Sequence, residues 1–177
     1  MSKIQEIIDQ IEEELPATEK VLARIPDDKL DWKPHERSMP LGQLAGHLAD
    51  MYGWFDFVIG KDKLDFAEPY DYPQQFDSAT LLTYLKKRVE DSRNTLQNTA
   101  SDDVLEEQWA LRNGEQVLWQ DKKKVVVRST FGHIAHHRGQ LAVYLRLLDI
   151  PVPAIYGPSA DEEWTDPADQ TATNAAL

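Results

Sequence analysis

The order of hydrophobic and polar positions predicts a largely helical chain. Apolar residues recur every three or four positions in four stretches, which is the spacing of one face of an α-helix. The first stretch begins at Ser2 and carries a run of glutamates on its polar side. Pro16 lacks an amide hydrogen, so we expect it to kink or interrupt this helix. The apolar stripe of the first helix consists of Ile4, Ile7, Ile8, Ile11, Leu15, Val21, Leu22 and Ile25.

A proline-rich connection at residues 26–40 precedes a second predicted helix, and Trp32 is its expected anchor. Ser38 can cap free backbone amides at the start of this helix, and Pro40 fits a first helical turn. The helical spacing then continues without a break to residue 59. The apolar stripe of the second helix consists of Leu41, Leu44, Leu48, Met51, Phe55 and Ile59.

A third helix is predicted after an irregular segment at residues 61–77. The acids, aromatic residues and prolines of that segment are typical of a loop packed across a helix end. Asp77 or Ser78 can cap the helix, and the basic triplet at residues 86–88 is expected on its exposed side. The apolar stripe of the third helix consists of Leu81, Leu85, Val89 and Leu96.

The helical spacing stops between residues 101 and 128. An Asn-Gly pair at residues 113–114 separates two short runs of strand-forming residues, which predicts a small β-hairpin. A lysine segment, expected in solvent, then leads into the last long helix at residues 129–148. The predicted fold class is therefore all-α, with one small hairpin before the last helix, in a single domain at residues 1–164. The small, polar and acidic composition of residues 165–177 predicts a flexible tail.

Charge and composition exclude several classes of protein. The chain has 31 acidic and 19 basic residues, a net charge of −12, which opposes binding to nucleic acids and to anionic membrane surfaces. Cysteine is absent, so neither a disulfide framework nor a thiolate metal site can form. No stretch is apolar enough to cross a bilayer, and the N-terminus has no apolar signal core. We therefore expect a cytoplasmic protein with a small-molecule substrate.

Three of the five histidines fall within five residues in the last long helix. His133 and His137 are four residues apart, so their imidazoles lie on the same helix face, and that face carries the apolar stripe. His47 lies beside the apolar stripe of the second helix. If these helices are neighbours, the three imidazoles converge and leave a coordination position open, as in catalytic zinc sites. His136 is rotated away from this face and is expected beside the site or at an interface.

Other polar residues near these positions are weaker candidates. Gln140 and Tyr144 follow on the same helix face and can support a ligand or touch substrate. Asp50, one turn after the histidine of the second helix, can orient that ligand, although an exposed helical aspartate is the commoner case. Arg138 points away from the histidine face and is expected in a structural salt bridge. Ile134 stands where a zinc protease of the His-Glu pattern has its glutamate base, so peptide hydrolysis by that route is not expected.

Two segments resemble the DinB/YfiT-like metalloenzyme family. The first is Gly-His-Leu-Ala-Asp at residues 46–50, and the second is His-Ile-Ala-His-His-Arg-Gly-Gln-Leu at residues 133–141. The resemblance extends to Asp-Trp-Lys-Pro-His at residues 31–35 and to Tyr-Gly-Pro-Ser-Ala-Asp-Glu at residues 156–162. It covers about residues 20–164, a span consistent with one domain.

The resemblance implies an up-down-down-up four-helix bundle with a metal-binding cleft at one end. Carried over by position, the ligands of a divalent ion, zinc or nickel, are His47, His133 and His137. Characterised relatives are transferases or isomerases that use a low-molecular-weight thiol in place of glutathione, and many members have no known activity. Family habit, together with the presumed exposure of Trp54 and Trp164, also suggests a homodimer.

These observations favour a metal-dependent enzyme that activates a thiol or water for attack on a small electrophile. Transferase chemistry ranks ahead of hydrolysis in this hypothesis. The alternative is a non-catalytic, stress-related or ligand-binding helical bundle with a structural or vestigial metal, because no general base is identifiable. A helical bundle with three ordinary buried histidines is a third possibility.

Overall fold

The structure is a computed structural model, and it describes residues 2–70, 72–73 and 76–163. The predicted tail at residues 165–177 therefore lies outside the described residues. The described part is mostly helical, with one small sheet. Its α-helices are α1 (Lys3–Leu22), α2 (Leu41–Met51), α3 (Trp54–Gly60), α4 (Ser78–Gln97) and α5 (Lys123–Leu147). Its remaining elements are the short helices η1 (Asp27–Lys29) and η2 (Asp102–Glu106) and the strands β1 (Lys63–Asp65), β2 (Gln108–Asn113) and β3 (Gln116–Lys122).

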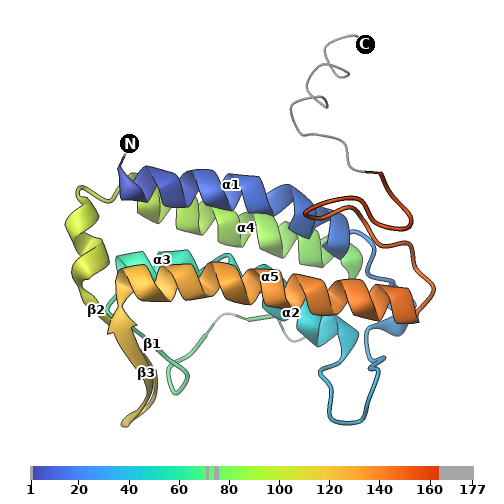
Figure 1. Cartoon of the computed structure of the whole chain (residues 1–177). Coiled ribbons are helices and arrows are strands. Elements are labelled where there is room, and N and C mark those ends of the chain that lie inside the picture. The colour runs from blue at the N-terminus through green and yellow to red at the C-terminus, as the bar shows by residue number, and fades with distance from the viewer. Residues whose placement is uncertain (1, 71, 74–75, 164–177) are drawn as a thin grey trace.

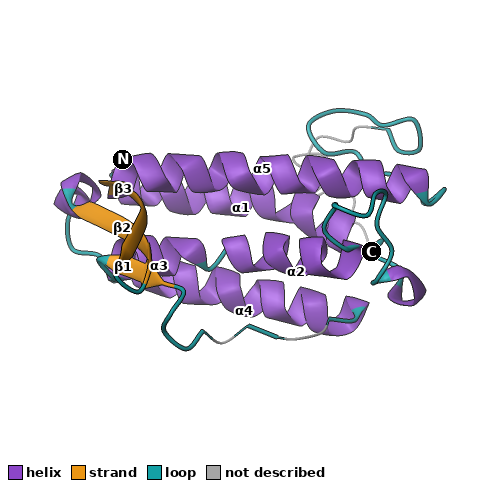
Figure 2. Ribbon diagram, turned by 90° about the horizontal axis from the view of Figure 1, so that it is seen from below, coloured by secondary structure: helices purple, strands orange, loops and turns teal. Residues whose placement is uncertain are grey.

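The long helices lie side by side around one hydrophobic core (Figures 1 and 2). Helix α1 packs against α4 and α5, and each of these two helices also packs against α2 and α3. Helices α2 and α3 follow each other in one row (Figure 2). The sheet lies at one end of the molecule, and η1 lies at the other (Figures 1 and 2). The predicted apolar stripes face this core, which is the packing that stabilises amphipathic helices.

The prediction that Pro16 interrupts the first helix is wrong, since α1 runs through it to Leu22. The side chain of Pro16 is exposed, and Ile11 and Thr18 on either side are buried. Proline removes only one intrahelical hydrogen bond, and the packing of both halves against the core keeps the helix continuous.

The second predicted helix differs from the structure at its start and in its middle. Ser38 does not cap it; Pro40 occupies the N-cap position without a side-chain hydrogen bond. At Gly53 the helix breaks into α2 and α3. A Cβ atom on Gly53 would lie 2.1 Å from the guanidinium carbon of Arg88, so glycine leaves the space that this side chain occupies.

Two basic side chains that were expected in solvent are buried. Arg88 is 6% exposed, and Lys123 at the start of α5 is 2% exposed. The Lys123 ammonium donates to the carbonyl of Ile59 at 3.2 Å and to the Glu107 carboxylate at 2.9 Å. Trp54, one of the two aromatic residues presumed exposed, is also buried, at 8% exposure. Trp164, the other, lies outside the described residues.

The predicted hairpin is present as β2 and β3, and a third strand extends it. Gly114 has a left-handed φ of 60° in the two-residue turn between Asn113 and Gln116, where glycine is favoured. Strand β1 pairs in parallel with β2, inside the segment that was expected to be irregular. The fully buried Trp109 of β2 donates its indole N–H to the Phe57 carbonyl at 3.1 Å, which fixes the sheet to α3.

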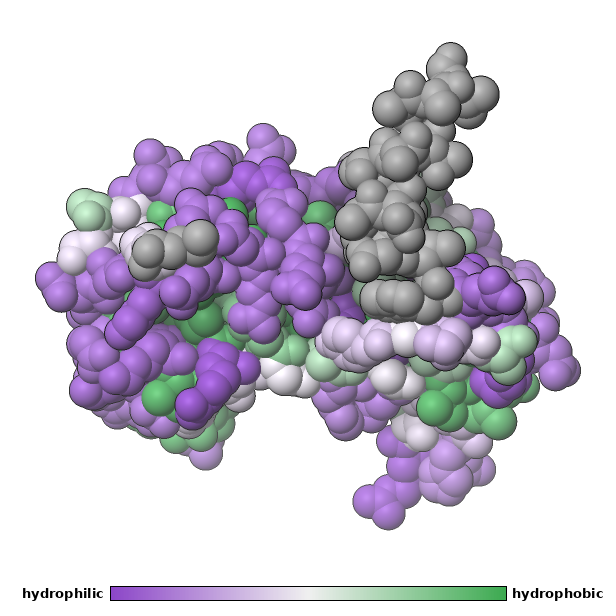
Figure 3. Space-filling view, turned by 45° about the horizontal axis from the view of Figure 1, so that its top comes forward, coloured by the Kyte–Doolittle hydropathy of each residue, from purple (hydrophilic) through white to green (hydrophobic). Residues whose placement is uncertain are grey.

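The surface is mainly polar. Figure 3 shows a predominantly hydrophilic face with small, separated hydrophobic areas. In the part of the chain that the structure describes, no helix is both long and apolar enough to cross a bilayer. After α5 the chain folds back on the helices. There Glu162 forms ion pairs with Lys20 of α1, at 2.9 Å, and with Arg24 in the turn after α1, at 2.7 Å.

Candidate metal centre

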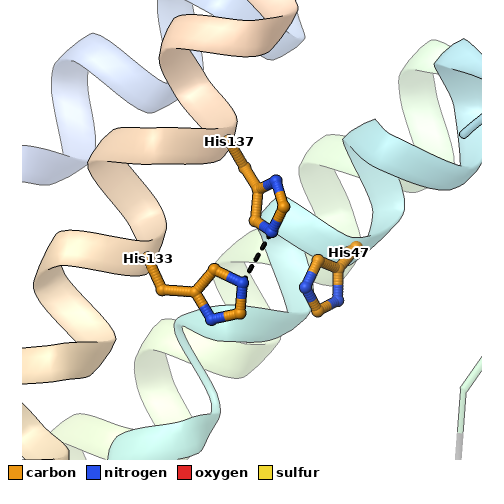
Figure 4. Close-up of side chains that lie close together, drawn as sticks. All are labelled: His47, His133 and His137. Atoms are coloured by element: carbon orange, nitrogen blue, oxygen red, sulfur yellow. Dashed lines mark hydrogen bonds between the residues drawn. The ribbon is translucent and has the colours of Figure 1, made fainter. Parts of the chain in front are cut away.

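Three histidine side chains from α2 and α5 converge where these helices pack together. His47 projects from α2 towards His133 and His137, which lie one turn apart on α5 (Figure 4). One nitrogen atom from each imidazole lies within 4.8 Å of the other two. His47 and His133 are half-buried, and His137 is 9% exposed. The helical spacing of four residues and the packing of α2 on α5 are sufficient to build this cluster.

A chain of hydrogen bonds orients the two imidazoles of α5. The Nδ1 atom of His137 lies 2.7 Å from Oε1 of Gln140, which can only accept, so His137 carries its proton on Nδ1. Its Nε2 atom then has a free lone pair, and it lies 2.7 Å from Nε2 of His133. One proton therefore lies between these two Nε2 atoms. Gln140 selects the nitrogen of His137 that faces the cluster, as partners of metal-binding histidines do.

Burial and mutual repulsion keep the cluster neutral. Burial, and after it the neighbouring His137, His47 and His136, lower the pKa of His133 to about 4. Burial also lowers the pKa of His47, assisted by His137 and opposed by the negative charge of Asp50. Burial and His136 lower the pKa of His137, whereas its hydrogen bond to the Gln140 oxygen raises it. At neutral pH all three rings are uncharged imidazoles, the form that binds metal ions.

This donor set fits a divalent ion. Neutral imidazoles suit zinc and nickel, and three of them leave room for a further ligand. The two Nε2 atoms that share a proton could both bind a cation in its place. Among the described residues no carboxylate belongs to the group of converging ligands.

Of the remaining α5 candidates, His136 lies next to the three imidazoles and Tyr144 contacts the connection before α2. His136 is exposed, with its ring centroid 5.0 Å from that of His137, and it lies at the edge of the cluster. Tyr144 packs its ring edge-on against Trp32 at 5.5 Å and donates to the Met39 carbonyl at 3.2 Å. Tyr144 thus joins α5 to the connection before α2.

Asp50 is buried, unlike most helical aspartates. Its carboxylate contacts Tyr70, Tyr84 and Arg88, and it makes no hydrogen bond to His47 among the described residues. It is 4% exposed and accepts hydrogen bonds from the hydroxyls of Tyr70 at 2.8 Å and Tyr84 at 2.6 Å. Nε of the buried Arg88 lies 3.4 Å from the same carboxylate. We call Asp50, Tyr70, Tyr84 and Arg88 the Asp50 cluster.

The sequence predictions missed three members of the Asp50 cluster. Arg88 had a usable signal, because it lies three residues after Leu85 and one before Val89, on the apolar side of its helix. Tyr70 had no such signal in the sequence, because it lies in an irregular segment and contacts Asp50 only in the folded chain.

The prediction of a structural salt bridge for Arg138 is confirmed. Its guanidinium is fully buried and pairs with the Glu14 carboxylate of α1 at 2.5 Å. It also donates to the hydroxyls of Thr18, at 3.1 Å, and Tyr156. Arg138, next to His137, therefore fixes α5 to α1. His133 and His137 lie on a different face of α5, which is turned towards α2.

Comparisons with known proteins identify the family and the fold. The model of the DinB family matches residues 1–171. The uncharacterized protein YrdA of Bacillus subtilis is 27% identical over 157 residues, which cover 85% of this chain and 86% of YrdA.

Two crystal structures share the fold. The DinB-like protein YjoA of Bacillus subtilis superposes with a TM-score of 0.64 at 19% identity, covering 90% of this chain and 99% of YjoA. A DinB-like protein from Bacillus cereus has a TM-score of 0.64 at 20% identity, covering 85% of this chain and 95% of its own. Because the family model spans nearly the whole sequence, the chain belongs to the DinB family.

Proposed function

We propose that this protein is a divalent-metal-dependent enzyme whose ion, zinc or nickel, is bound by His47, His133 and His137. The observation that carries the proposal is the convergence of three neutral imidazoles from two helices within 4.8 Å. Three imidazoles leave a coordination position for a reacting group, whereas structural zinc sites are usually closed by four protein ligands.

The reaction that we propose is the transfer of a low-molecular-weight thiol to a small electrophile. Hydrolysis, in which water attacks the electrophile in place of the thiol, ranks second. A bound divalent ion lowers the pKa of a thiol or water and so supplies a nucleophile near neutral pH. The thiol loses its proton to solvent water, its sulfur forms a bond to the electrophilic carbon, and the leaving group departs with the electron pair of the broken bond. Gln140 holds His137 in the orientation that keeps Nε2 towards this centre.

The architecture that we propose for this function is an up-down-down-up four-helix bundle in residues 1–164. In this description α2 and α3 count as one helix that is interrupted at Gly53. Residues 165–177 are then a tail outside the domain. Limited proteolysis followed by mass spectrometry tests the boundary: cleavage confined to residues after 164 supports it, and rapid cleavage between the long helices contradicts it.

Metal analysis of the purified protein tests the ion-binding half of the proposal. We expect about one equivalent of zinc or nickel in the wild type and loss of that metal in His47→Ala, His133→Ala and His137→Ala. His35→Ala is the matched control, because His35 is exposed in the connection before α2 and does not belong to the group of converging ligands. Full metal retention in all three ligand variants would sink the proposal.

A panel of thiols tests the catalytic half. Cysteine, glutathione and mercaptoethanol are each mixed with a chloronitrobenzene, and chloride release is compared for metal-loaded wild type, metal-free wild type and His133→Ala. We expect thiol-dependent turnover in the metal-loaded wild type only.

A non-catalytic, ligand-binding protein with a structural metal is the second candidate. The observation that favours it is the Asp50 carboxylate, which is bound by Tyr70, Tyr84 and Arg88 and is not free to act as a base. Stoichiometric metal without turnover above the metal-free protein, across thiols and water, would support this candidate against the enzyme.

A homodimer is also proposed, on weaker grounds, since the burial of Trp54 removes one of its two reasons. Exposed apolar residues remain on α5, where Val143 is 58% and Leu147 is 56% exposed. Light scattering over a range of concentrations tests the proposal, and a constant monomer mass would exclude the dimer.

A further inference from the structure

A cleft near η1 has the size of a small-molecule site. It has a volume of about 610 Å³, and ligand pockets in proteins measure about 300–1,000 Å³. It lies between η1, the start of α2 and the chain before α4. We call it the η1 cleft and define it by Asp28, Asp31, Trp32, Gln43, Tyr72 and Phe76.

The η1 cleft is linked to both helices that carry the three histidines, on α2 through residues next to His47 and on α5 through Tyr144. Gln43 of α2 lies four residues before His47, on the same helix face. The Phe76 ring packs so closely on Gly46, the neighbour of His47, that a Cβ atom there would lie 2.2 Å from it. From α5, Tyr144 reaches the cleft by its ring contact with Trp32.

Aromatic rings form much of the wall. Trp32 and Tyr72 are half-buried, and Phe76 is 7% exposed. The rings of Tyr72 and Phe76 meet edge to face, with centroids 5.6 Å apart. Partly exposed aromatic faces bind apolar groups, and they also attract cations.

Three aspartates and one lysine line the η1 cleft, and one of the three carboxylates has no partner among the described residues. Asp27 accepts a hydrogen bond from the backbone amide of Ser78 at 2.8 Å, and Asp28 pairs with Lys29 at 3.2 Å. Asp31 is exposed, and its side chain has no hydrogen bond or ion pair with any other residue that the structure describes. The net charge of −12 adds a field that favours cations.

We propose that the η1 cleft binds an organic ammonium compound with an apolar or aromatic body. The ammonium group pairs with Asp31 and lies against the face of Trp32, while the body contacts Phe76. This binding requires no metal ion. The further statement, that the bound amine is the substrate or thiol co-substrate of the metal centre, rests on the proposed function, because Gln43 and Gly46 connect the cleft to His47.

Titration of the full-length, metal-free protein with phenethylamine tests the proposal. Calorimetry and the NMR signals of the tryptophan indoles monitor the binding. We expect saturable binding that perturbs the Trp32 signal. The uncharged isostere 2-phenylethanol should bind at least about fivefold more weakly, since it lacks the charge pair with Asp31. Absence of saturable binding, or equal affinity for the two compounds, would overturn the proposal.

Variants identify the groups involved. We expect Asp31→Asn to weaken phenethylamine binding about fivefold or more and Trp32→Leu to weaken it further, whereas Glu90→Gln should leave it unchanged. Glu90 is exposed on α4 and has no ion pair with a described residue, so its variant removes the same charge elsewhere. Equal binding by the Asp31 and Glu90 variants contradicts the proposal. His133→Ala separates the two proposals, because it should lose metal and keep the amine.

Discussion

At the scale of single residues, the hydrogen bond between Gln140 and His137 decides which imidazole nitrogen is available to a metal. With the proton of His137 on Nδ1, its Nε2 atom faces the other histidines. An orienting partner of this kind lowers the cost of binding an ion, because the ring is already fixed.

We predict that Gln140→Leu lowers zinc affinity about 10–100-fold, the usual effect of losing such a partner. Gln140→Glu keeps an acceptor at the same position and should retain most of the affinity. Competition with a chromogenic chelator measures both variants. Wild-type affinity in the leucine variant would mean that the hydrogen bond has no part in metal binding.

Asp50 is the second residue with a testable role, as the counter-charge of a buried arginine. Asp50→Asn leaves the Arg88 guanidinium buried without its carboxylate, and breaking such a pair costs about 3–5 kcal/mol. We predict a loss of this order in the free energy of unfolding, measured by urea denaturation. Asp91→Asn is the control: Asp91 also approaches Arg88, at 3.7 Å, but it is more exposed and its loss should cost below about 1 kcal/mol.

At the scale of elements, the break between α2 and α3 depends on a residue from another helix. Gly53→Ala places a methyl group where the Arg88 guanidinium lies, so we predict destabilisation of about 1–3 kcal/mol. Gly139→Ala on the exposed face of α5 meets no atom within 4 Å, and it should stabilise the protein by about 0.5–1 kcal/mol. Opposite signs in thermal or urea unfolding would confirm the steric explanation, and equal signs would contradict it.

The same break illustrates how far the sequence could predict the elements. Amphipathic stripes located the long helices, and the Asn-Gly pair located the hairpin, because these signals are local. Of the two predicted caps, Asp77 and Ser78, the structure uses Asp77, which forms a capping box with Thr80. The break at Gly53 and the strand β1 depend on Arg88 and on pairing with β2, which are contacts between distant parts of the chain.

The site was predictable for a similar reason. The spacing of His133 and His137 within one helix singles them out, and the place of His47 beside an apolar stripe made it the third candidate, which the family resemblance supported. The hydrogen bond of Gln140 and the Asp50 cluster follow from side-chain geometry and packing, which no periodicity encodes.

At the scale of the whole molecule, the chain after α5 is held to the helices by carboxylates. Pairing with Arg24 and Lys20 lowers the pKa of Glu162, and pairing with Arg146 lowers the pKa of Asp161. Asp161 also accepts a hydrogen bond from the Val152 amide at 2.8 Å. Residues 149–163 therefore depend on these charges, as well as on apolar packing against the core, for their position on the helices.

We predict that acid releases this segment while the helical core stays folded. A carboxylate whose pKa is lower in the folded state stabilises the fold above its unfolded pKa, about 4, and loses that effect as the pH falls through the folded value. Hydrogen exchange at Val152, corrected for intrinsic rates, should accelerate below about pH 4. Asp161→Asn should accelerate it already at pH 7, and exchange that is independent of pH in the wild type would contradict the prediction.

The positions of the three histidines also determine when the protein can acquire an ion. His47 lies in the first third of the sequence, whereas His133 and His137 lie in the last long helix. A growing chain therefore has one ligand until α5 has been synthesised, and the cluster forms only after α2 and α5 have docked. In the proposed metal centre, the complete set of three ligands is therefore available only in molecules that have finished synthesis and assembly.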